Sequence, residues 1–273
     1  MLEFLKAVLF GIVEGITEWL PISSTGHMIL LNEFVRLEVS PKFWELFLVV
    51  IQLGAILAVV LLFWKKIFPI EKKKSYRLNP QIMNMWYKVV VACIPAAVVG
   101  LLFDDILEQY LYNYITVSLA LILFGVAFII IEEKNKTMVS KINTINEITW
   151  KTAIIIGGFQ LIAAIFPGTS RSGATILGAL LIGVSRTVAA EFTFFLAIPV
   201  MLGASLLKLL KYGFHYTATE WSLLAVGMVV AFLVSVFVIK FLMDYIKKHD
   251  FKIFGWYRII LGSLVLLYFG IIA

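Results

Sequence analysis

The chain has 273 residues, of which 62% are hydrophobic and 15% charged, and its formal net charge is +6. Soluble domains are only about 45–50% apolar, so this composition excludes an ordinary soluble domain and indicates an integral membrane protein. The basic residues cluster in loops between apolar runs, a pattern of membrane topology rather than of nucleic-acid binding. Backbone groups in lipid must bond within their own segment, and strand-like alternation is absent, so we expect an all-α fold rather than a barrel.

Two short apolar segments differ from the rest of the chain. The segment 8–20 ends at Pro21 and the segment 152–166 ends at Pro167, and each is followed by a small polar cluster and a second short apolar run. This pattern suits a re-entrant helical hairpin better than a full span. Six other runs are long enough to cross a hydrocarbon core of roughly 30 Å. They are 43–64, 86–103, 115–132, 189–208, 220–241 and 256–272.

The two broken segments resemble each other. Residues 21–24, with the sequence PISS, align with residues 167–170, with the sequence PGTS. Seven residues before each proline stands a polar side chain, Glu14 in the first segment and Gln160 in the second. The match indicates an internal duplication.

This duplication predicts a single membrane domain, 1–273, with pseudo-repeats at about 1–132 and 150–273. Three full spans separate equivalent points of the two halves. Because three is odd, the two hairpins would enter the membrane from opposite sides, as an inverted repeat.

Loop charges predict the orientation independently. Loop 65–88 carries seven Lys or Arg residues, loop 133–151 four and loop 242–255 three, whereas loop 104–114 has none and carries three acids. Under the positive-inside rule, both termini then lie outside. The tips of the two hairpins would meet near the middle of the bilayer.

Glu14 and Glu18 are the first candidate site residues. They are four positions apart, so a helix places both on one face. Acids at membrane depth are costly, and they usually mark an ion, proton or substrate site. Two carboxylates completed by phosphate oxygens and water suit Mg²⁺ or Ca²⁺, so we predict a divalent-cation site here. The alternative is a shallow hairpin whose acids touch interfacial water.

The next candidates form the sequence SSTGH. Ser23 or Ser24 can cap the helix that resumes after Pro21, and the free N–H groups of that helix start, at Thr25 and Gly26, can bind an anion. His27 lies three residues after Ser24, which could pair a hydroxyl nucleophile with a base or leave His27 itself as the nucleophile. The alternatives are simple capping by the serines and an interfacial histidine.

The second break carries the sequence PGTSRSGATI. Arg171 lies between Ser170 and Ser172, and Gly173 and Thr175 follow in the helix that resumes there. An arginine can bind phosphate oxygens bidentately and stays charged when it is desolvated. We therefore predict a phosphate site, with a cytoplasmic arginine of the positive-inside type as the alternative.

Together these residues predict a protein that binds a polyanionic phosphate and cleaves it. A transporter or flippase for a phosphorylated lipid would use the same arginine and helix starts, and inverted repeats with broken helices are typical of transporters. Binding alone does not need paired acids beside a serine and a histidine, and this favours hydrolysis.

At residues 13–27 and 167–176 the chain resembles the undecaprenyl-diphosphate phosphatase family, the bacitracin-resistance membrane proteins. The similarity continues through 50–60, 94–103 and 191–204. The resemblance implies a multi-pass enzyme of the bacterial cytoplasmic (inner) membrane with its active site facing outward. It implies hydrolysis of undecaprenyl diphosphate to undecaprenyl phosphate and inorganic phosphate, which recycles the lipid carrier for peptidoglycan and confers bacitracin tolerance.

The resemblance also assigns roles by position. Glu14 and Glu18 match the glutamate motif, with a dependence on Mg²⁺ or Ca²⁺, and Ser24 and His27 match the proposed nucleophile and base. Arg171 and its two flanking serines match the phosphate-binding motif. The expected partners are a polyprenyl diphosphate and membrane lipids, and a homodimer is left open.

Overall fold

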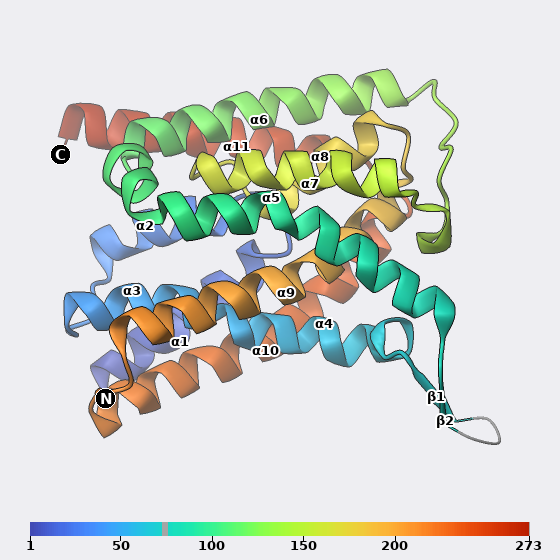
Figure 1. Cartoon of the computed structure of the whole chain (residues 1–273). Coiled ribbons are helices and arrows are strands. Elements are labelled where there is room, and N and C mark those ends of the chain that lie inside the picture. The colour runs from blue at the N-terminus through green and yellow to red at the C-terminus, as the bar shows by residue number, and fades with distance from the viewer. Residues whose placement is uncertain (73–75, 273) are drawn as a thin grey trace.

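The computed structural model describes residues 1–72 and 76–272, which form a bundle of helices with one short pair of strands (Figure 1). The helices are α1 (Leu2–Thr17), α2 (Ser24–Phe34), α3 (Pro41–Val50), α4 (Gln52–Ile67), α5 (Pro80–Leu111), α6 (Tyr114–Asn135), α7 (Trp150–Ile165), α8 (Arg171–Leu181), α9 (Arg186–Tyr212), α10 (Ala218–Ile246) and α11 (Lys252–Leu267). A 3₁₀ turn (Ile145–Glu147) precedes α7, and a π turn (Tyr268–Ile272) follows α11. Strands β1 (Ile70–Lys72) and β2 (Tyr76–Leu78) pair antiparallel inside the predicted basic loop, of which Lys73 and Lys74 lie outside the described residues.

Six stretches of the described helices are long and apolar enough to cross a membrane, so the prediction of a multi-pass, helical protein is confirmed. They are Pro41–Leu62, Pro80–Phe103, Tyr114–Asn135, Arg186–Tyr212, Ala218–Ile246 and Lys252–Ile271.

The helices depart from the predicted runs most clearly in two places. The run 43–64 is divided into α3 and α4 by a turn at Ile51. Helix α5 continues to Leu111, so most of the predicted loop 104–114 is helical. The reason is that no glycine or proline follows Gly100 before Leu111, and acids alone do not end a helix.

Helix α9 lies at the centre of the bundle. It contacts α3, α4, α5, α8 and α10, and its residues 188–198 are buried. Around it, α1 packs along α10, α7 packs along α5, and α6 packs along α11. This arrangement places both helix breaks against buried side chains rather than at the surface of the bundle.

The two breaks have the same backbone conformation at their last residue. Ser23 (φ 73°) and Ser170 (φ 68°) lie in the left-handed region, which is uncommon for residues other than glycine. Each serine caps the helix that follows, because its side chain accepts a hydrogen bond from the backbone N–H of Gly26 or Gly173. The alignment of Ser24 with Ser170 is therefore shifted by one position, since the second break is one residue longer after its proline.

Candidate active site

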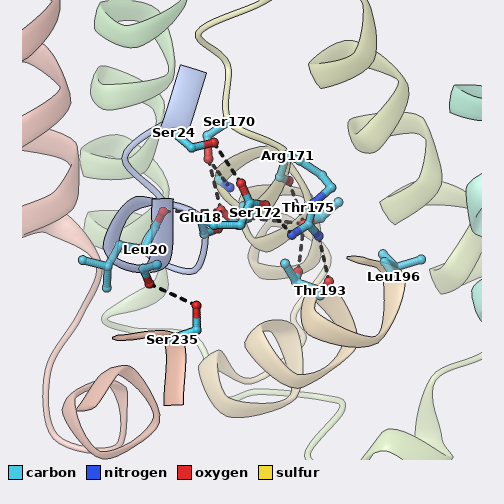
Figure 2. A network of polar contacts seen from close by, with 12 residues as sticks. Glu18, Leu20, Ser24, Ser170, Arg171, Ser172, Thr175, Thr193, Leu196 and Ser235 are labelled. Atoms are coloured by element: carbon cyan, nitrogen blue, oxygen red, sulfur yellow. Dashed lines mark hydrogen bonds and ion pairs between the residues drawn. The ribbon is translucent and has the colours of Figure 1, made fainter. Parts of the chain in front are cut away.

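The two breaks meet through an ion pair. Arg171, the first residue of α8, places its Nη2 2.9 Å from Oε1 of Glu18, which is 153 residues away in the sequence. The two side chains are only 13% and 6% exposed. A second nitrogen of Arg171, Nη1, donates to the backbone carbonyl of Thr193 in α9 at 2.9 Å (Figure 2). The structure thus brings the predicted arginine to the predicted glutamate.

Glu18 is shared between the two helices that resume after the breaks. Its second oxygen, Oε2, accepts a hydrogen bond from the hydroxyl of Ser24, the first residue of α2, at 2.8 Å. Ser172 joins the same region from the other side, since its hydroxyl lies 3.1 Å from the backbone carbonyl of Glu18 (Figure 2). One carboxylate therefore contacts a hydroxyl and a guanidinium that come from opposite halves of the chain.

His27 lies beside this cluster but does not bond to Ser24. Its Nδ1 lies 2.7 Å from the backbone carbonyl of Ser23, and its Nε2 lies 2.6 Å from the hydroxyl of Tyr257 in α11. A carbonyl can only accept, so Nδ1 carries the proton and Nε2 accepts from the tyrosine. The hydroxyl of Ser24 has Glu18 as its partner instead, so the predicted serine–histidine pair is not formed.

Glu14 and Arg171 each keep one atom without a hydrogen-bond partner. Glu14 is only 1% exposed, and its Oε1 has no partner among the described residues. The same holds for Nε of Arg171. Buried polar groups are usually satisfied, so such exceptions often mark a place where a ligand binds. Oε1 of Glu14 is thus available to a cation, and the N–H at Nε of Arg171 is available to an anion.

Most of the other predicted substrate-binding residues make hydrogen bonds within the two breaks and the helix starts that follow them. The backbone N–H groups of Gly26 and Gly173 donate to the side chains of the capping serines, Ser23 and Ser170. The hydroxyl of Ser170 lies 3.1 Å from that of Ser172. Thr175 is buried and donates to the backbone carbonyl of Arg171 at 2.9 Å.

Thr25 is the last of the predicted substrate-binding residues. It is half-buried in the first turn of α2. It therefore neither supports nor weakens the predicted anion site.

Helix α11 contributes two residues that sequence reasoning missed. Tyr257 bonds to His27, and Arg258 is fully buried and donates to backbone carbonyls in both breaks. The sequence held a signal for Arg258, because it is the only charged residue in the run 256–272, and charged residues inside spans are usually functional. No comparable signal marked Tyr257.

The fold and this cluster define a class of protein: a multi-pass helical membrane protein with a buried polar site between two broken helices. A family profile described as bacitracin resistance protein BacA matches residues 7–264. The chain belongs to this family.

Relatives along the full length of the chain carry consistent names. A protein of Desulfitobacterium hafniense named undecaprenyl-diphosphatase is 65% identical, and the match covers 99% of this chain and 97% of that protein. Undecaprenyl-diphosphatase 1 of Clostridium acetobutylicum is 64% identical, with 99% of both chains covered. Undecaprenyl-diphosphatase of Enterococcus faecalis is 61% identical, with 97% of both chains covered.

Proposed function

We propose that this protein hydrolyses undecaprenyl diphosphate to undecaprenyl phosphate and inorganic phosphate at the site between the two breaks. The activity recycles the lipid carrier of cell-wall synthesis and confers bacitracin tolerance. The observation that carries the proposal is the position of Glu18, between the hydroxyl of Ser24 and the guanidinium of Arg171. Phosphoryl transfer to a side chain requires a hydroxyl, a base within hydrogen-bond reach of it, and a positive group such as a guanidinium that binds the phosphate.

In this proposal Ser24 is the nucleophile and Glu18 its base. The oxygen of Ser24 forms a bond to the terminal phosphorus, the bridging P–O bond breaks, and undecaprenyl phosphate leaves with the electron pair. Glu18 takes the hydroxyl proton through its Oε2, which is 2.8 Å away. Water then hydrolyses the phosphoserine, which releases inorganic phosphate and restores the hydroxyl. His27 is not the base in this scheme, because its two ring nitrogens face the carbonyl of Ser23 and the hydroxyl of Tyr257.

Arg171 binds the terminal phosphate in this scheme. Its Nε is a buried donor without a partner, and its contacts to Glu18 and to Thr193 hold the guanidinium in place. An arginine so held stabilises the charge that develops on the transferred phosphoryl group without having to reorganise. Its bond to Glu18 also keeps that carboxylate oriented toward Ser24.

A divalent cation, Mg²⁺ or Ca²⁺, is the proposed ligand of the two glutamates. Glu14 and Glu18 would hold it together with phosphate oxygens and water, and it would neutralise charge on the diphosphate. The unpartnered Oε1 of Glu14 supports this placement. Over residues 1–72 and 76–272 no three His, Cys, Asp or Glu side chains are grouped to hold a metal, which agrees with a cation that takes some of its ligands from the substrate.

The duplication and the membrane orientation are part of the proposal. The chain is a single membrane domain whose two hairpins, α1–α2 and α7–α8, are re-entrant and related as an inverted repeat. Three features support this: the matching conformations of Ser23 and Ser170, the packing of α1 on α10 and of α7 on α5, and the position of both termini at the end opposite β1–β2 (Figure 1). With the basic loops in the cytoplasm, the termini and the active site face outward from a bacterial inner membrane.

The test is a free-phosphate assay on detergent-purified protein with a long-chain isoprenyl diphosphate, with and without a chelator. We expect wild-type protein to release phosphate only when a divalent cation is present. Glu18→Gln should lower kcat about 100-fold or more, since a general base contributes at least that much. Glu33→Gln, near the C-terminal end of α2 and in an ion pair with Arg36, is the matched control. Wild-type protein that binds the lipid and releases no phosphate would refute hydrolysis and favour a flippase.

A further inference from the structure

Arg258 contacts both helix breaks at once. Its Nη1 donates to the carbonyl of Pro21 at 3.1 Å, in the first break. Its Nη2 donates to the carbonyls of Gly168 and Thr169 at 3.1 and 2.7 Å, in the second break. Its Nε lies 3.4 Å from the carbonyl of Leu121 in α6. Each nitrogen of the guanidinium therefore has a backbone partner.

The surroundings of Arg258 indicate that its charge is balanced by backbone dipoles rather than by an acid. The side chain is fully buried, and all the hydrogen bonds described for it go to carbonyl oxygens. Burying a cation without an opposite charge is expensive, and natural proteins keep such a group when it has a specific task. Here the carbonyls that it binds belong to the two segments which carry Glu18 and Arg171.

The close packing of α11 on α6 places Arg258 at this position. A Cβ atom added to Gly125 would lie 2.7 Å from the carbonyl oxygen of Gly255, and one added to Gly262 would lie 2.8 Å from that of Ser118. Such approaches are possible only without side chains. Gly255 and Gly262 flank Arg258 by one turn on either side, so α11 lies against α6 where the guanidinium must reach the breaks.

The geometry of the site requires an arginine rather than a lysine. The accepting carbonyls diverge from two separate segments, and a planar fork with five N–H donors can reach all of them, whereas an ammonium is a single point. The start of α8 is also shaped around this side chain. A Cβ atom added to Gly173 would lie 2.8 Å from Nη1 of Arg258.

From these contacts we propose that Arg258 is a positioning residue, which sets the separation of the two helix breaks and so brings Glu18 to Arg171. It does not touch the substrate; it acts through the backbone of Pro21 and of Thr169. The expected effect of Arg258 on kcat rests on the proposed hydrolysis, whereas its expected effect on the separation of the breaks does not.

The experiment compares Arg258→Lys and Arg258→Met with Arg186→Lys. Arg186 is the matched control, because it too is an arginine whose guanidinium is held by a buried partner, here the carboxylate of Glu132, and it contacts neither break. Ile16 and Phe166 are two exposed side chains next to the breaks. Spin labels on cysteines introduced at these two positions, in a Cys93→Ala background, report the separation of the breaks by double electron–electron resonance. Phosphate release from the same unlabelled variants gives kcat and KM.

Both Arg258 variants should broaden the distance distribution and lower kcat about 100-fold, since a displacement of about 1 Å at an active site can cost that much. KM should change far less than kcat, because Arg258 does not touch the substrate and a misalignment of Glu18 and Arg171 acts mainly on the transition state. Arg186→Lys should leave the distance distribution and kcat close to wild type. Arg258→Lys also covers the case in which Arg258→Met does not fold.

Two results would overturn the inference. One is an unchanged distance distribution in folded Arg258→Lys. The other is a changed distribution with wild-type kcat, which would show that the separation does not matter for the reaction. If wild-type protein released no phosphate, the proposed function would fail while the distance measurement would still decide whether Arg258 sets the separation of the breaks.

Discussion

At the scale of single residues, Glu18 is the centre of the site because its two oxygens face different partners. Oε1 faces Arg171 and Oε2 faces Ser24. The guanidinium holds the carboxylate in one orientation, so Oε2 points at the hydroxyl before any substrate arrives. This arrangement makes Ser24, rather than His27, the better candidate nucleophile.

Ser24→Ala should therefore abolish phosphate release, by at least about 1000-fold in kcat, because loss of a nucleophile removes the covalent route. The lipid should still bind, since Arg171 and Glu14 remain. Burst-phase trapping of a phosphorylated protein in the wild type, and its absence in the variant, provides the measurement. Ser222→Ala is the control, because that serine is exposed on α10 and its hydroxyl donates to the carbonyl of Ala218, one turn earlier in the same helix. A Ser24→Ala variant with substantial turnover would assign the attack to water or to His27.

His27 is the second residue with a defined prediction. Because Nδ1 faces a carbonyl and Nε2 faces Tyr257, the neutral ring should be the Nδ1–H tautomer. Nitrogen-15 chemical shifts of the labelled histidines measure this directly, and His27→Gln assigns the signal among the three histidines of the chain. Tyr257→Phe keeps the stacked ring but removes the donor, so the Nε2 shift should move while the Nδ1 shift stays. An Nε2–H tautomer in the wild type would show that this geometry is incorrect.

At the scale of elements, the two breaks depend on serines in a backbone conformation that glycine adopts more easily. Ser170 caps α8 through the N–H of Gly173 at 3.1 Å and has a φ of 68°. The side chain stabilises the helix start, while the left-handed backbone costs about 1–2 kcal/mol. Strain of this kind is typical of functional sites, where the surrounding packing maintains it.

Substitutions at Ser170 should separate these two effects. Ser170→Ala loses the cap, which costs about 1 kcal/mol, and keeps the unfavourable φ. Ser170→Gly also loses the cap, but glycine tolerates the positive φ, so this variant should be the more stable of the two. Thermal unfolding in detergent gives the order, with Ser40 as a comparison, because it caps α3 from an ordinary extended conformation. At Ser40 glycine should also be better than alanine, because it is the better N-cap, but the difference between the two variants should be smaller than at Ser170; an equal difference at both serines would show that φ is not the cause.

At the scale of the whole molecule, the sequence predicted the spans and the meeting of the breaks but not what holds them. The apolar runs are long, so the six spans were recognisable, and Glu18 and Arg171 were identifiable because charges inside apolar segments are costly. The partner of Ser24 was not predictable, since it depends on the turn formed by residues 18–23. Arg258 carried a signal as a lone charge in an apolar run, but its partners, like the contact of Tyr257 with His27, arise only from the packing of α11 and could not be predicted from the sequence.

The orientation of the whole chain gives the last prediction. If the basic loops are cytoplasmic, the connection between α9 and α10 lies outside and the connection between α10 and α11 lies inside. His215 and His249 are exposed in these two connections, so His215→Cys and His249→Cys are matched reporters on either side of one span. In a Cys93→Ala background, a membrane-impermeant thiol reagent should label position 215 in intact cells and position 249 only after permeabilisation. The background protein without an added cysteine should stay unlabelled. Labelling of position 249 alone in intact cells would reverse the orientation and place the termini in the cytoplasm.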